Sequence, residues 1–140
     1  MHLVFDSLTG NVRRLAGRVA REAGGVEVLD LRRVSAEVDF LLLTYTFHQG
    51  AVPDSTRAFL VRHHHHLRGV VASGSYHWGD HFARAADLIA CAYGVPIVAK
   101  VNKSGTDADV ARIARWVQTH RHAPLSPPTL PEEPWNPGPS

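Results

Sequence analysis

The 140-residue sequence is poor in cysteine and has no long apolar run. It contains one cysteine, Cys91, which excludes a disulfide within the chain, a CxxC redox motif and a zinc site built from several cysteines. No apolar run reaches the roughly 18 residues that are needed to cross a bilayer. The first residues also lack the basic segment and apolar core of a signal peptide. These absences predict a cytoplasmic protein that is not associated with a membrane.

The sequence also has little excess of positive over negative charge. The formal net charge is +2, and only 20% of the residues are charged, with no long tract of lysine or arginine. The sequence therefore lacks the electrostatic footprint of a nucleic-acid-binding protein. Its hydrophobic content of 44% and its length are typical of one globular domain.

Short apolar runs alternate with helical patterns along most of the chain. The runs predict buried strands at residues 2–5, 26–31, 40–43, 70–73 and 96–101, of which 26–31 is the weakest. Helical patterns follow at residues 11–23 and from near Asp54, Asp80 and Thr106, the last with Asp109 placed as in a capping box. This order predicts an α/β fold, with a five-stranded parallel sheet and helices on both faces.

The composition changes near residue 123. Seven of the nine prolines fall in residues 124–140, which cannot form a helix or a central strand. We therefore expect a folded domain at residues 1–122 and a disordered, proline-rich tail at 123–140. The alternative is a polyproline segment that binds a partner through Trp135.

The loop after the first predicted strand, "DSLTGN", is rich in polar side chains and has no lysine. It precedes a helix at the carboxyl edge of the sheet, where open α/β folds bind ligands. Ser7, Thr9 and Asn11 offer hydrogen bonds, Gly10 allows a close backbone approach, and the helix start offers free N–H groups. The loop matches neither GxxxxGK[ST] nor GxGxxG. It predicts a cradle for a phosphate monoester, unless its side chains only cap the helix.

Two further loops fall at the same edge and are rich in aromatic residues. They are "TYTFHQGAVP" at residues 44–53 and "GSYHWGD" at residues 74–80. A phosphate cradle between two aromatic loops suits a planar ring on a phosphorylated chain, which is the shape of flavin mononucleotide (FMN). The alternative is that these aromatic residues are partly buried packing residues.

Four stretches carry a family resemblance. They are "FDSLTGNVRR" (5–14), "LLTYTFHQGAVPDST" (42–56), "GVVASGSYHWGDHFARAAD" (69–87) and "SGTDADV" (104–110). Together they resemble the NrdI family, the small flavodoxin-like partners of class Ib ribonucleotide reductase. The resemblance covers residues 3 to about 119. It implies a flavodoxin-like fold with strand order 2-1-3-4-5, a bound FMN and a redox role.

The resemblance also implies which residues bind the cofactor. The phosphate would be held by Ser7, Leu8, Thr9, Gly10, Asn11 and Val12. The ring would be enclosed by Thr44, Tyr45, Thr46, Phe47, Gly50, Ser73, Gly74, Trp78 and Gly79. Trp78 and either Tyr45 or Phe47 would flank the two faces of the ring. The backbone carbonyl of Gly50 would face flavin N5. No metal ligand and no catalytic side chain are expected, because the chemistry takes place on the flavin.

The family role follows as a further implication. Reduced flavin would react with dioxygen, and the oxidant so formed, such as superoxide, would help the reductase small subunit to assemble its dimanganese–tyrosyl radical cofactor. The expected partners are that subunit, dioxygen and an unidentified flavin reductant, and the protein would be an accessory rather than a stand-alone enzyme. The main alternative is a flavodoxin-type single-electron carrier. An FMN reductase and a flavin-free phosphate-binding module are less favoured alternatives.

The loop composition bears on this choice. Residues 44–53 and 73–79 contain no Asp or Glu, but they do contain His48 and His77. A nearby negative charge disfavours an anion, so these loops should destabilise the anionic hydroquinone less than acidic loops do. We therefore expect the two one-electron couples to lie closer together than in a typical flavodoxin.

Three other features carry structural expectations. The run of histidines at residues 63–66 should lie at the end of the second helix, remote from the cofactor and mostly solvated. Cys91 lies in an apolar stretch and is expected to be structural. Asp80 is expected to cap the third helix.

Overall fold

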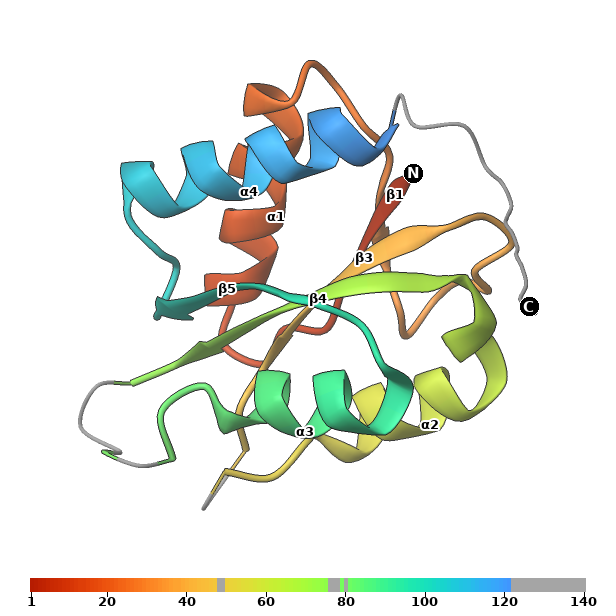
Figure 1. Ribbon diagram of the computed structural model, residues 1–140. Coiled ribbons are helices and arrows are strands. Elements are labelled where there is room, and N and C mark those ends of the chain that lie inside the picture. The colour runs from red at the N-terminus through yellow and green to blue at the C-terminus, as the bar shows by residue number, and fades with distance from the viewer. Residues whose placement is uncertain (48–49, 76–78, 80, 122–140) are drawn as a thin grey trace.

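The computed structural model describes residues 1–47, 50–75, 79 and 81–121. Five strands form one parallel sheet with the order β2-β1-β3-β4-β5 (Figure 1). They are β1 (His2–Phe5), β2 (Val28–Asp30), β3 (Phe40–Tyr45), β4 (Leu67–Gly74) and β5 (Ile97–Asn102). This arrangement confirms the predicted fold class and strand order.

Helices cover both faces of the sheet (Figure 1). They are α1 (Asn11–Glu22), α2 (Asp54–His63), α3 (Arg84–Tyr93) and α4 (Asp107–Arg121), with a short 3₁₀ helix η1 (His64–His66) after α2. In β3, Leu41 and Leu43 pack with α1 and α4, whereas Phe40 and Leu42 pack with α2 and α3. A strand buried on both faces is apolar throughout, which explains the continuous apolar runs in the sequence.

The start of α4 has the predicted capping box. The backbone N–H of Asp109 donates to Thr106 Oγ1 at 3.1 Å, and the backbone N–H of Thr106 donates to Asp109 Oδ2 at 2.9 Å. The two bonds satisfy N–H groups that the helix itself leaves without a partner. Across the described part of the chain, no helix is both long and apolar enough to cross a membrane.

The start of α3 differs from the expectation. The helix begins at Arg84, not near Asp80, and no side chain of the described residues caps it. Ala83 has a positive φ of 50°, and its backbone nitrogen lies 2.7 Å from the point where a Cβ on Gly74 would stand. Ala83 is therefore packed closely on the end of β4, directly before the helix begins. Asp80 itself lies outside the described residues, as does the proline-rich segment 122–140.

Cys91 is exposed, so it does not pack in the core as its apolar stretch suggested. The buried residues of α3 are Ala85, Ala86 and Ile89, and Cys91 lies off that face. Because the whole stretch around Cys91 is apolar, the sequence does not show which of its residues face the core.

The histidine run lies at the end of α2, just before β4 begins, and thus at the edge of the sheet opposite the strands' carboxyl ends. Two of its imidazole rings pack on other aromatic side chains, which the expectation of a mostly solvated run did not include. His63 packs on Phe59 with ring centroids 4.5 Å apart, and His64 stacks on Tyr93 at 5.2 Å. Within the described ranges, no three His, Cys, Asp or Glu side chains are grouped to hold a metal ion.

Candidate functional site

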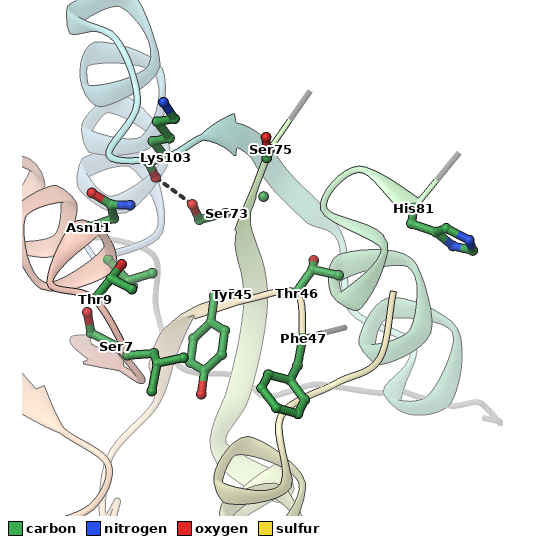
Figure 2. A pocket seen from close by; sticks show the side chains of 13 residues that line it. Ser7, Thr9, Asn11, Tyr45, Thr46, Phe47, Ser73, Ser75, His81 and Lys103 are labelled. Carbon is green, nitrogen blue, oxygen red and sulfur yellow. Dashed lines mark hydrogen bonds between the residues drawn. The ribbon is translucent and has the colours of Figure 1, made fainter. Parts of the chain in front are cut away.

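A pocket of about 700 Å³ opens at the carboxyl edge of the sheet (Figure 2). Pockets that hold small molecules usually measure about 300–1,000 Å³. Most of the predicted site residues line it, namely Ser7, Leu8, Thr9, Asn11, Val12, Tyr45, Thr46, Phe47, Ser73 and Gly74. The pocket also contains Ser75, His81 and Lys103, which the sequence did not single out. The fold thus brings the three expected loops together around one cavity.

The loop between β1 and α1 forms one end of this pocket. Gly10 precedes α1 with a φ of 92°, and its N–H donates to Ser7 Oγ at 3.1 Å. No side chain caps the helix. The alternative that these polar residues only cap α1 is therefore wrong. The first N–H groups of the helix and its positive dipole end remain available to an anion.

A cation lies close to this loop although residues 7–11 contain none. Arg14 Nη2 donates to Asn11 Oδ1 at 2.6 Å. Its Nη1 lies 3.3 Å from the point where a Cβ on Gly10 would stand. Arg14 comes from the first turn of α1 and is not among the residues that line the pocket. Its guanidinium therefore braces the loop.

Aromatic side chains form another wall of the pocket. Tyr45 and Phe47 meet edge to face, with ring centroids 6.4 Å apart and an interplanar angle of 78°. Phe47 and Ala51 exchange two backbone hydrogen bonds of 2.7 and 2.8 Å, which close the loop between them. Thr46 Oγ1 accepts a bond of 3.2 Å from the Ala85 N–H, which ties this wall to α3. The wall is therefore held by backbone bonds and offers apolar surface to a planar ring.

A buried carboxylate lies close to Tyr45. Asp6, at the end of β1, accepts hydrogen bonds at Oδ2 from Ser55 Oγ and Thr56 Oγ1. Its Oδ1 lies 3.1 Å from Arg32 Nη2, in an ion pair whose geometry is not that of a hydrogen bond. The sequence had not indicated this pairing.

Asp6 is one of the groups that affect the pKa of the Tyr45 phenol. Burial raises the pKa of Tyr45 above its ordinary value of 10.0, and the charge of Asp6 raises the pKa further. Arg32 and hydrogen bonds to the Ser55 and Arg32 side chains act in the opposite direction. The phenol is therefore protonated at neutral pH.

Several predicted residues do not line the pocket. Thr44 is buried, and its Oγ1 lies 2.7 Å from Thr56 Oγ1 at the start of α2. Gly50 is buried with a φ of 93°, and a Cβ there would lie 2.7 Å from Arg84 Cδ. Gly10 and Gly79 are also absent from the lining. Trp78, His48 and His77 lie outside the described residues.

The three additional lining residues differ in how well the sequence could have revealed them. Ser75 belongs to the loop already singled out after β4. Lys103 follows β5, so its place at the carboxyl edge could have been inferred from the fold alone. His81 comes just before α3, and its Nδ1 is buried without a hydrogen-bond partner in the described part of the chain. None of the described lining residues is an Asp or a Glu.

A family model described as NrdI flavodoxin-like matches residues 3–115. The chain belongs to this family. It is 52% identical to the protein NrdI of Deinococcus radiodurans over 141 residues, which cover 99% of each chain. It is 40% identical to the protein NrdI of Bacillus licheniformis over 122 residues, which cover 84% of this chain and 88% of the relative.

Solved structures support the fold of this NrdI-family chain. A short-chain flavodoxin associated with a non-canonical PDU bacterial microcompartment matches with a TM-score of 0.67 and 19% identity, covering 84% of this chain and 93% of the flavodoxin. Oxidised flavodoxin 1 from Bacillus cereus also matches with a TM-score of 0.67, at 20% identity, covering 87% of this chain and 97% of the flavodoxin. A flavodoxin-like fold and NrdI membership imply a flavin cofactor.

Proposed function

We propose that this protein binds FMN in the pocket at the carboxyl edge and supports a class Ib ribonucleotide reductase. The observation that carries the proposal is the uncapped start of α1, which opens into a pocket with aromatic residues on another wall. An anion-binding end and an apolar wall match the two parts of FMN. Once bound and reduced, FMN supplies electrons to dioxygen, and the resulting oxidant serves assembly of the dimanganese–tyrosyl radical cofactor in the small subunit.

The residues of the chain bind and position the cofactor in this proposal. Backbone N–H groups at the start of α1 and the hydroxyls of Ser7 and Thr9 would hold the phosphate. Tyr45 and Phe47 would contact the ring, with Thr46, Ser73 and Gly74 at its edges. The backbone carbonyl of Gly50 would face flavin N5, and Trp78 would contact the second face of the ring. Gly79 would support the same loop, and Thr44 would act indirectly by fixing the start of α2.

The charge of the pocket supports this role over that of a low-potential electron carrier. Its described lining has no carboxylate, and it includes Lys103 and His81. Asp6 lies nearby, but it pairs with Arg32. A reduced, anionic ring would therefore meet little repulsion, so we expect closely spaced one-electron couples.

The test is reduction of the purified protein followed by an oxygen pulse. We expect a protein that turns yellow with FMN and, once reduced without oxygen, activates a manganese-loaded small subunit when oxygen is admitted. A protein that is colourless after incubation with FMN and removal of the unbound FMN would exclude the flavin assignment. Binding of FMN with a widely separated, very low second couple and no activation would instead identify a single-electron carrier.

A further inference from the structure

Lys103 occupies an unusual position at the mouth of the pocket. It follows β5 and lines the pocket together with residues of the first loop, and its side chain extends away from Ser7 and Thr9 in Figure 2. Its φ is 57°, in the left-handed region that residues other than glycine rarely adopt. Such conformations persist where the surrounding structure fixes them, and they cluster at functional sites.

The backbone around Lys103 is held from several directions. The Lys103 N–H donates to the Gly74 carbonyl at 2.9 Å, and the Lys103 carbonyl accepts a hydrogen bond from Ser73 Oγ. Arg18, on α1, lies 3.4 Å from the carbonyls of Ser104 and Gly105 and pairs with Asp107 at 2.6 Å. These bonds fix the position of Lys103 relative to β4, α1 and α4.

The ammonium group, by contrast, has no ionic partner among the described residues. Lys103 is exposed and forms no ion pair with the described part of the chain. The nearby Lys100 differs, because it pairs with Asp87 at 2.6 Å. A fixed backbone therefore carries a free cation at a pocket whose described lining has no carboxylate. A lysine on a flexible four-carbon stem can adjust to a charged ligand.

We propose that Lys103 pairs with the phosphate of the bound ligand and makes the pocket prefer a phosphorylated flavin to the unphosphorylated one. This inference rests on the proposed FMN function. The phosphate is favoured over the ring because the two residues after Lys103 lie against Arg18 of α1, the helix whose start would bind the phosphate, whereas Tyr45 and Phe47 form a different wall (Figure 2). The free N–H groups of α1 and the ammonium would then share a doubly charged group.

The rival cation is Arg14, which also lies at the first loop. Its guanidinium is engaged with Asn11 Oδ1 at 2.6 Å and does not line the pocket. Arg14 should therefore support the loop without reading the charge of the ligand. Arg115 is a third cation suited to a control, because it lines a separate hollow with Trp116 and forms no ion pair with the described residues.

The experiment compares FMN and riboflavin affinities, measured by quenching of flavin fluorescence at low and high salt. The variants are Lys103→Met, Lys103→Arg, Arg14→Gln and Arg115→Gln. We expect Lys103→Met to weaken FMN binding by about tenfold, the effect of roughly 1.4 kcal/mol, and to leave riboflavin binding unchanged. FMN binding by Lys103→Met should also depend less on salt concentration than FMN binding by the unaltered protein. Lys103→Arg should retain the preference, and Arg115→Gln should change neither affinity.

The other outcomes overturn the inference. An unchanged preference for FMN in Lys103→Met, or equal losses for FMN and riboflavin, would show that Lys103 does not read the phosphate. A preference that is lost in Arg14→Gln and kept in Lys103→Met would assign the role to Arg14. If the unaltered protein binds FMN and Lys103→Met gives one of these contradicting results, only the role of Lys103 is excluded and the proposed function stands. If the unaltered protein bound neither flavin, both proposals would fall.

Discussion

Arg32, in the segment after β2, pairs with Asp6 at the end of β1, with 3.1 Å between Nη2 and Oδ1. The Asp6 side chain is completely buried, whereas 46% of the Arg32 side chain is exposed. The pair therefore neutralises a buried charge from the solvent side. Because Asp6 also binds Ser55 and Thr56, it connects the end of β1 to the start of α2.

Removal of this carboxylate should destabilise the fold. We expect Asp6→Ala to lower the free energy of unfolding by about 2–3 kcal/mol, because it leaves two hydroxyls and a guanidinium without their shared acceptor. The matched control is Asp54→Ala, whose exposed pair with Arg57 should contribute no more than about 0.5 kcal/mol. Urea unfolding measures both variants. Equal losses in the two would mean that the Asp6 network contributes nothing special.

Gly50→Ala should also destabilise the protein. The φ of 93° is unfavourable for any residue with a side chain, and the new Cβ would lie 2.7 Å from Arg84 Cδ. We expect a loss of about 1–2 kcal/mol in the free energy of unfolding. The control is Gly17→Ala in the middle of α1, where nothing lies within 4 Å of the new Cβ.

The control should have the opposite effect. Alanine is the better helix former by about 0.5–1 kcal/mol, so Gly17→Ala should stabilise the protein. Thermal or urea unfolding of the two variants gives the comparison. A Gly50→Ala protein as stable as the unaltered chain would show that the loop relaxes easily around this position.

The sequence was most informative where one local pattern decided the structure. The apolar runs located all five strands because the sheet is covered on both faces, and the capping box at Thr106 and Asp109 located α4. The start of α3 was misplaced: the helix begins at Arg84, directly after the close contact between Ala83 and Gly74, and no local pattern records that contact.

The candidate site divides in the same way. Its first loop could be read from hydroxyls and a glycine before a helix. The Asp6–Arg32 pair and the position of Lys103 depend on contacts between residues far apart in the chain. Such contacts appear only once the strands are arranged, because any of the chain's charged residues could in principle have made them.

The histidine run should make stability depend on pH through His63. Burial lowers the pKa of His63 below its ordinary value of 6.5, and the charges of Arg62, His65 and His66 lower it further, while a backbone hydrogen bond with Ala36 opposes them. On acidification the unfolded chain takes up this proton before the folded chain does. The contribution of His63 is therefore present above pH 6.5 and is lost as the pH falls through and below that value.

Urea unfolding at pH 7.5 and 5.5 measures this effect. We expect His63→Leu to reduce the loss of stability between the two pH values, because leucine keeps an apolar contact with Phe59 and takes up no proton. Val61→Ala, at an exposed position of the same helix, is the control and should leave the pH dependence unchanged because it removes no titratable group. If His63→Leu and the unaltered protein lose equal stability on acidification, the pH dependence comes from other groups.

The absence of carboxylates from the described pocket lining predicts how an added one would act. His81 lines the pocket, and its Nδ1 has no hydrogen-bond partner among the described residues, so His81→Asp places a negative charge there without breaking a described bond of that atom. We expect the second one-electron potential of bound FMN to become more negative and the two couples to separate, since a nearby negative charge disfavours the anionic reduced ring. His120→Asp, which adds the same charge on α4, should shift the potential much less, because solvent and salt screen a distant charge. Anaerobic redox titration of both variants measures the difference, and equal shifts would show that the lining does not set the potential.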